Sequence, residues 1–340
     1  MKVLVTGTEG YLGCLLASAL LREGHDVIGV DTGYYKAGWL YSGLDRTPYT
    51  VCTDIRRLRA DDLRGVDAVV HMAELSNDPL GELIKDVTFD VNHGGSLHLA
   101  TLAKAAGVRR FVCMSSCSVY GVAEGEVDES SPTDPQTSYA VCKTLVERDV
   151  AAMASDDFSP TFLRNATAFG ASPRMRFDIV LNNLAGLAWT TRRIAMTSDG
   201  TPWRPLVHAL DIARAIRCVL VADVDAVYNE TFNVGSDRQN YQVREIAQAV
   251  ADVFPGCELT FGASGGDNRS YRVSFDKINR RLPGFACEWD VARGAQQLHD
   301  LFATVDLDAA TFNGRGHTRL KQLEYLLRTR QVNRQLFWSE

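Results

Sequence analysis

A glycine-rich segment near the start of the chain constrains the fold most strongly. Residues 2–7 form an apolar run of strand length, and residues 11–24 repeat apolar side chains at helical spacing. Gly7, Gly10 and Gly13 stand between the two in a G-x-x-G-x-x-G pattern. A bare backbone at the start of a helix lets a phosphate approach free N–H groups. The segment therefore predicts a phosphate-binding turn between a strand and a helix.

Strand-like and helix-like segments then alternate along the chain. Helical patterns cover 95–107 and 138–153, and strand-like runs cover 26–31, 67–73, 109–115, 159–165 and 230–235. This alternation predicts an α/β fold, a Rossmann-type doubly wound parallel sheet covered on both faces, with a smaller C-terminal substrate lobe.

The same pattern suggests a division of the chain. We expect residues 1–165, with a returning segment near 205–235, to form a dinucleotide-binding Rossmann domain. Residues 166–204 and 236–310 would form the substrate-binding lobe, and residues 311–340 a C-terminal helical tail with leucines at helical spacing.

Composition excludes several classes of function. The formal net charge of -6 and the scattered Lys and Arg residues argue against a nucleic-acid partner or an anionic membrane. The eight cysteines form no CxxC pair, which is typical of reduced thiols in the cytoplasm. No apolar run is long enough to span a bilayer, and no signal peptide is visible. The seven histidines form no close metal-binding pattern, so we expect no metal.

Asp31 indicates which dinucleotide is bound. It ends the second predicted strand, eighteen residues beyond Gly13. A carboxylate there accepts hydrogen bonds from ribose hydroxyls and repels a 2'-phosphate, so NAD is favoured over NADP. Glu9 is unexpected within a pyrophosphate loop, and we expect its side chain to face solvent or the substrate side.

Ser116, Tyr139 and Lys143 form a candidate catalytic triplet. Tyr139 and Lys143 are four positions apart on a predicted helix and therefore share one face. A nearby ammonium and a positive nicotinamide ring lower a tyrosine pKa by roughly one to three units. Tyr139 could then act as a base on a sugar or alcohol hydroxyl that Ser116 holds.

These motifs together resemble the extended short-chain dehydrogenase/reductase family, in particular its NAD-dependent nucleotide-sugar epimerases and dehydratases. The resemblance rests on the glycine pattern, Asp54–Ile55, "HMA" at 71–73, Asn92, "SSCSVYG" at 115–121, "YAVCK" at 139–143 and "RPLVHALDIARA" at 204–215. It implies bound NAD, a nucleotide-sugar substrate and a homodimer. The implied cofactor-binding residues are Gly7, Gly10, Tyr11, Leu12, Gly13, Asp31, Asp54, Ile55, Met72, Ala73, Asn92, Ser115, Tyr139 and Lys143.

The resemblance also implies substrate contacts. Arg204 of "RPLVH" would hold the diphosphate, and Arg269 or Arg272 would provide a second clamp. The family's R-x-x-N-x-x-G pattern appears at 164–170 with Thr167 in place of Asn. The full implied set is Ser76, Ser118, Thr167, Asn182, Asn183, Arg204, Arg269 and Arg272.

The reaction itself is predicted from a missing pair of carboxylates. The family's 4,6-dehydratases carry an Asp-Glu pair where this chain has Cys117 and Ser118, so a 4-epimerase acting through a transient 4-keto sugar is favoured. Cys117 or Glu74 as an added acid or base leaves open a 3- or 5-epimerase or a 4-keto reductase. A 4,6-dehydratase is a weaker alternative. An NAD-binding regulatory protein is another, although such proteins usually lack the tyrosine and lysine.

Overall fold

A computed structural model describes residues 1–76, 78–263 and 269–339 of the protein. Its largest element is a parallel sheet in the order β11-β7-β5-β4-β1-β2-β3. The strands are β1 (Lys2–Thr6), β2 (Asp26–Asp31), β3 (Tyr49–Cys52), β4 (Ala68–His71), β5 (Arg110–Ser116), β7 (Ser159–Asn165) and β11 (Glu230–Val234). The predicted doubly wound parallel sheet is confirmed, and β3 at its edge was not predicted.

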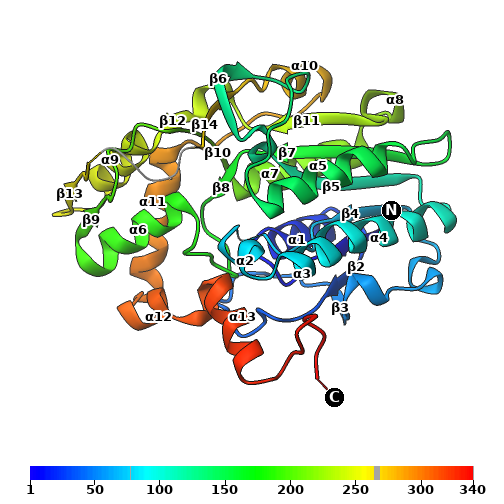
Figure 1. The fold of residues 1–340 in the computed structure, drawn as a ribbon, viewed down its shortest axis with the longest axis horizontal. Coiled ribbons are helices and arrows are strands. Elements are labelled where there is room, and N and C mark those ends of the chain that lie inside the picture. The colour runs from blue at the N-terminus through cyan, green and yellow to red at the C-terminus, as the bar shows by residue number, and fades with distance from the viewer. Residues whose placement is uncertain (77, 264–268, 340) are drawn as a thin grey trace.

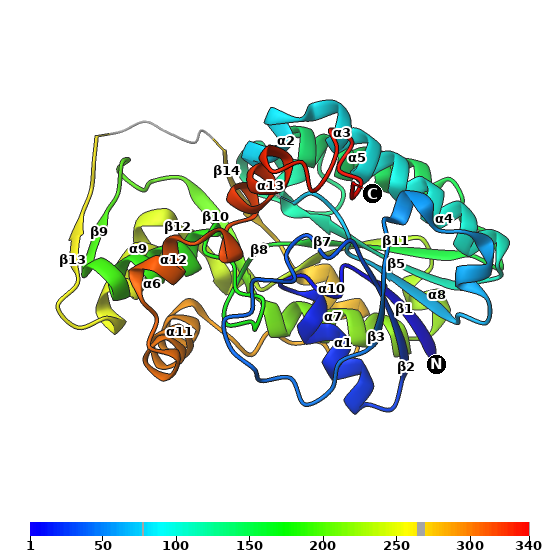
Figure 2. The same cartoon turned by 90° about the horizontal axis from the view of Figure 1, so that it is seen from below.

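Helices cover both faces of the sheet, as Figures 1 and 2 show. One layer contains α2 (Asp78–Leu83), α3 (Lys85–Phe89), α4 (Gly95–Ala105) and α5 (Ser138–Ala151). The other contains α1 (Gly13–Arg22), α7 (Ala209–Val221) and α10 (Asp276–Arg281), with the short α8 (Val224–Val227) near the sheet edge. Each layer packs an apolar core of its own against the sheet. Because the strands are buried on both faces, their sequences are continuous apolar runs.

A smaller lobe lies at one end of the sheet (Figure 2). Among the described residues it holds a sheet of β8 (Thr167–Phe169), β10 (Trp203–His208) and β12 (Asn240–Gln242) and a pair of β9 (Arg193–Ala195) and β13 (Glu258–Thr260). A further pair, β6 (Val122–Val127) and β14 (Ser270–Val273), packs with the core of the main sheet. The helices of the smaller lobe are α6 (Val180–Thr191), α9 (Val243–Val253), α11 (Val291–Val305) and α12 (Ala309–Asn313). Tyr11 joins the lobes, because its hydroxyl donates to the Gly170 carbonyl at 2.7 Å.

The C-terminal residues lie against the sheet domain. The predicted amphipathic helix is present as α13 (Arg319–Arg328), and its leucines pack with Tyr34, Leu75 and Val332. Beyond the helix, the chain turns back through a bridge between Val332 and Trp338. In Figure 1 this red segment passes beneath the edge formed by β2 and β3. The tail is therefore helical only as far as Arg328.

Candidate active site

A cavity of about 590 Å³ opens at the carboxyl ends of the central strands, where the two lobes meet. Parallel strands bring the residues at their carboxyl ends to one edge, and ligands bind at this edge in open α/β sheets. Most predicted site residues line it: Gly7, Gly10, Tyr11, Leu12, Gly13, Asp31, Asp54, Ile55, Met72, Ala73, Glu74, Ser76, Ser115, Ser116, Ser118, Tyr139, Lys143, Thr167, Arg204 and Arg269.

The glycine loop fits the pyrophosphate of a dinucleotide. Gly7 has a φ of +79°, which favours glycine. A Cβ on Gly13 would lie 2.0 Å from the Gly7 carbonyl oxygen, so α1 can pack against the loop only without a side chain there. The first turn of α1 thereby presents its backbone N–H groups at the cavity.

Asp31 stands where the adenosine ribose is expected. Its carboxylate accepts hydrogen bonds from the backbone N–H groups of Glu9 at 2.9 Å and Gly33 at 2.8 Å. Burial raises the pKa of the Asp31 carboxyl, and these two bonds oppose that rise. The side chain is thus held in place at the cavity wall as an acceptor for hydroxyls.

Substituting Asp31→Ser is expected to weaken NAD binding by roughly 10- to 150-fold, because a hydrogen bond to a charged group contributes about 1.5–3 kcal/mol. NADP binding should weaken much less, since the repulsive carboxylate is gone. Calorimetric titration with both cofactors measures the ratio. Asp45→Ser, at a side chain 60% exposed, is the matched control. An unchanged NAD-to-NADP ratio in the Asp31 variant would contradict this role.

The negative charge of Glu9 is paired with a buried arginine. Its carboxylate forms an ion pair with Arg174, whose side chain is almost fully buried. Arg174 also donates to the Tyr35 carbonyl at 3.0 Å and to the Lys36 carbonyl. The Glu9 side chain is 30% exposed and lies outside the cavity lining, so the expectation of the substrate side was wrong and the expectation of a solvent-facing side chain holds in part. The acid ties the glycine loop to the segment after β2, and its charge is compensated there.

The candidate catalytic triplet comes together at the cavity. The Thr137 side chain caps α5 by accepting from the Ala140 N–H at 3.2 Å, which places Tyr139 in the first turn. Lys143 follows one turn later, with Nζ 5.4 Å from the Tyr139 ring centroid. Ser116 ends β5, and its hydroxyl accepts from the Ser118 N–H at 3.1 Å. All three side chains line the same space.

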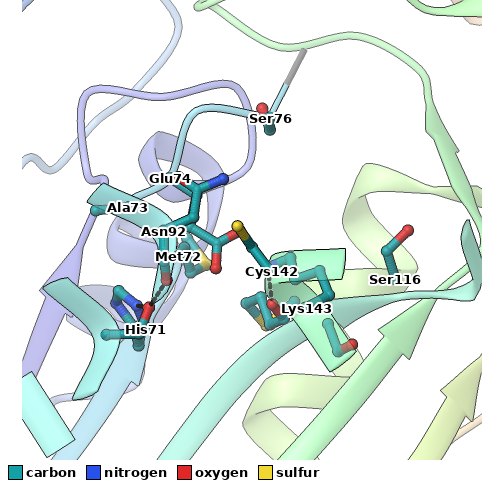
Figure 3. A network of polar contacts seen from close by, with 12 residues as sticks. His71, Met72, Ala73, Glu74, Ser76, Asn92, Ser116, Cys142 and Lys143 are labelled. Atoms are coloured by element: carbon teal, nitrogen blue, oxygen red, sulfur yellow. Dashed lines mark hydrogen bonds and ion pairs between the residues drawn. The ribbon is translucent and has the colours of Figure 1, made fainter. Parts of the chain in front are cut away.

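Lys143 is paired with Glu74. The two side chains form an ion pair and are each only 4% exposed, and Lys143 also donates to the Met114 carbonyl. Burial lowers the pKa of Lys143, but the Glu74 carboxylate together with Tyr139 and Cys113 outweighs this effect, so the pKa is raised. Burial raises the pKa of Glu74. Figure 3 shows Glu74 and Lys143 close together, with Ser116 standing apart from them.

The loop that carries Glu74 is fixed from two sides. The Thr6 hydroxyl accepts from the N–H groups of Met72 at 3.0 Å and Ala73 at 3.1 Å. Asn92 accepts from the Leu75 N–H at 2.8 Å and donates to the Leu75 carbonyl at 3.1 Å. Asn92 was predicted to bind the cofactor, but it lies outside the cavity lining, and its side-chain amide bonds to this loop.

Four other candidates also lie outside the cavity lining. The Cys117 thiol is buried and donates to the Arg164 carbonyl at 3.2 Å, and burial raises its pKa, which argues against the acid/base role. Asn182 and Asn183 bond to backbone groups of the 170–177 segment. Arg272 is exposed, because alternation along β14 turns Tyr271 toward the cavity instead. Of the two proposed clamps, Arg269 is therefore the one at the site.

Two arginines at the site were not predicted. Arg176 binds both carboxylate oxygens of Asp178, at 2.8 and 3.3 Å, and donates to the Ser76 hydroxyl at 3.0 Å. Arg319 reaches the cavity from the start of α13. The "RMRFD" sequence at 174–178 was a usable signal, since alternating Arg and apolar residues ending in Asp suggest buried charge pairs. Nothing in the local sequence marks Arg319.

Two negative findings concern the described residues. Within them, no group of three His, Cys, Asp or Glu side chains is placed to hold a metal ion. No helix there is both long and apolar enough to cross a bilayer.

The chain is similar to known proteins of one family. Residues 3–235 match the model of the NAD-dependent epimerase/dehydratase family. A UDP-glucose 4-epimerase from Neisseria gonorrhoeae is 26% identical, over 88% of this chain and 95% of its own.

Solved structures give the same picture. A UDP-glucose 4-epimerase from Stenotrophomonas maltophila, with bound NAD and formylated UDP-arabinopyranose, has a TM-score of 0.77 at 26% identity, covering 90% of this chain and 99% of its own. A dTDP-glucose 4,6-dehydratase from Streptomyces venezuelae, with bound NAD, has a TM-score of 0.77 at 26% identity, covering 89% and 97%. The chain is thus similar both to a 4-epimerase and to a 4,6-dehydratase.

Proposed function

The chain belongs to the NAD-dependent epimerase/dehydratase family, and we propose that within it the protein is a nucleotide-sugar 4-epimerase. The observation that supports this choice is the content of the cavity: Ser116, Tyr139 and Lys143 line it, and the positions of a dehydratase acid/base pair hold Cys117 and Ser118. The Cys117 thiol is buried behind the cavity wall, and Ser118 carries no titratable group at neutral pH.

Each member of the triplet has a defined task in this proposal. NAD, when bound, supplies a reversible hydride acceptor. Tyr139 takes the proton of the sugar C4 hydroxyl as a phenolate and returns it later, and Ser116 orients that hydroxyl by a hydrogen bond. The Lys143 ammonium favours the phenolate form and binds the nicotinamide ribose. Turning the 4-keto sugar over in the cavity then inverts C4 without a further acid or base.

Arg204 and Arg269 would bind the diphosphate of the nucleotide. Arg204 comes from β10 in the smaller lobe, and its guanidinium donates to the Trp203 carbonyl at 2.8 Å and to the Arg269 carbonyl. Both side chains line the cavity. Guanidinium groups bind phosphate oxygens in forked pairs, so two of them suit a nucleoside diphosphate.

Glu74 supports a second candidate. It is a cavity carboxylate beside the catalytic lysine, so it could exchange a proton with a sugar carbon next to a ketone. A 3- or 5-epimerase, or a 4-keto reductase, would use it in that way.

Solvent deuterium separates these reactions. The protein is incubated in deuterated water with a panel of UDP-, dTDP- and GDP-sugars, and the products are read by NMR. A 4-epimerase returns the hydrogen that it removed, so we expect an inverted C4 without carbon-bound deuterium. Deuterium at C3, C5 or C6 would overturn the proposal in favour of an enolising epimerase or a dehydratase. Homodimerisation and cytoplasmic location stay predictions, and light scattering checks the first.

A further inference from the structure

Arg319 is a buried cation whose guanidinium has no direct hydrogen-bonding or ion-pair partner in the described part of the protein, although the Asp178 and Asp31 carboxylates act on it from a distance. Its residue is 5% exposed, and its guanidinium carbon lies 4.0 Å from the Tyr35 ring centroid. Across residues 1–76, 78–263 and 269–339, this guanidinium makes no hydrogen bond or ion pair, although it has five N–H donors. A buried charge without acceptors is costly, so the position calls for an anion.

The nearest carboxylate is committed elsewhere. Asp178 gives both oxygens to the Arg176 guanidinium, and from Arg319 it accepts the backbone N–H, at 3.3 Å. Burial, together with the positive charge of Arg176, lowers the pKa of Arg319 to about 10, and the arginine remains charged at neutral pH. Arg176 and Arg319 therefore share the Asp178 carboxylate at the cavity wall, and Asp31 acts on Arg319 only from a distance.

The surroundings indicate which anion Arg319 binds. Tyr35, which supports the guanidinium, follows Asp31 by four residues on the adenosine side of the cavity. Arg174 ties the Tyr35 carbonyl to Glu9 of the glycine loop. Arg319 thus lies with the elements that bind NAD, whereas Arg204 and Arg269 come from the smaller lobe.

The rest of the C-terminal segment is anchored to the same elements. Gln322 donates to the Tyr34 carbonyl at 2.8 Å, and the Trp338 indole donates to the Thr32 carbonyl at 2.7 Å. The Phe337 ring packs against the Arg56 and Arg57 guanidinium groups, whose carbons lie 4.0 and 4.2 Å from its centroid. Residues 319–338 therefore cover the loops after β2 and β3.

We propose that this C-terminal segment is part of the cofactor site and that Arg319 binds the pyrophosphate of NAD. The proposal is independent of which sugar reaction the protein catalyses, because its test uses binding alone.

The test compares Arg319→Met, Arg319→Lys and the exposed control Arg328→Met in the full-length protein freed of cofactor. NAD, adenosine and UDP are titrated calorimetrically. We expect Arg319→Met to weaken NAD binding by about 10- to 100-fold, Arg319→Lys to weaken it less, and adenosine and UDP to bind all variants alike. A loss of UDP affinity with NAD unchanged would assign Arg319 to the substrate diphosphate and overturn the proposal.

Thermal unfolding separates this role from a structural one. Removing a buried charge that has no direct hydrogen-bond or ion-pair partner should raise the melting temperature of the cofactor-free protein, while the further rise caused by NAD shrinks. A merely structural arginine would show the reverse: a lower melting temperature with the NAD-induced rise intact. That result would overturn the proposal even if Arg319→Met bound ligands poorly because it was partly unfolded.

Discussion

Replacing Tyr139 with Phe is expected to lower kcat by about 10²- to 10⁴-fold, the usual contribution of a positioned acid or base. Loss of the hydroxyl removes the proton acceptor at the cavity and leaves the ring beside Lys143 in place. NAD affinity and melting temperature should change little, because the ring fills the same space at the first turn of α5. The variant is assayed on the nucleotide sugar that the panel identifies.

Tyr49→Phe is the matched control, since its side chain on β3 is 78% exposed and outside the cavity lining. It removes the same atom without affecting the proposed chemistry. Full activity of Tyr139→Phe would eliminate the proposed base. If that variant also served the cell as well as the wild-type protein does, a regulatory NAD-binding role would be favoured over catalysis.

The parts of the site that depend on local sequence were predictable. Gly7 and Asp31 stand at the carboxyl ends of apolar strands, and parallel strands bring these ends to one edge of the sheet. Tyr139 and Lys143 share a helix face through their spacing alone. These positions need only the strand order, which the alternation of strands and helices largely determines.

The parts of the site that depend on packing between distant segments could not be predicted. Arg319 meets Tyr35 through the docking of α13, a contact across 284 positions of the chain that no local pattern encodes. Asn92 and Cys117 have the right residue types near the right motifs, but their side chains turn to backbone groups within the protein. A motif therefore locates a backbone segment more reliably than it tells which of its side chains reaches the cavity.

Glu74→Gln is expected to have the second large effect, because it leaves the buried Lys143 ammonium without its carboxylate. Breaking a buried ion pair on one side typically costs about 3–5 kcal/mol of unfolding free energy, and bound NAD should restore part of it. The activity should survive if Tyr139 is the base. Without the negative charge the phenolate is favoured, so the rising limb of the pH–rate profile should move to lower pH by about one unit.

Glu147→Gln separates the loss of stability from the shift of the pH–rate profile. Glu147 forms another buried pair, with Arg164 at 2.6 Å, and lies outside the cavity lining. Its substitution should lower stability to a similar degree without moving the pH–rate limb. If Glu74→Gln instead lowered kcat by about 10²-fold or more and kept the pH limb in place, Glu74 would be exchanging protons with the sugar itself. The enolising reactions would then explain this cavity better than a 4-epimerase does, because Tyr139 alone completes the simpler chemistry.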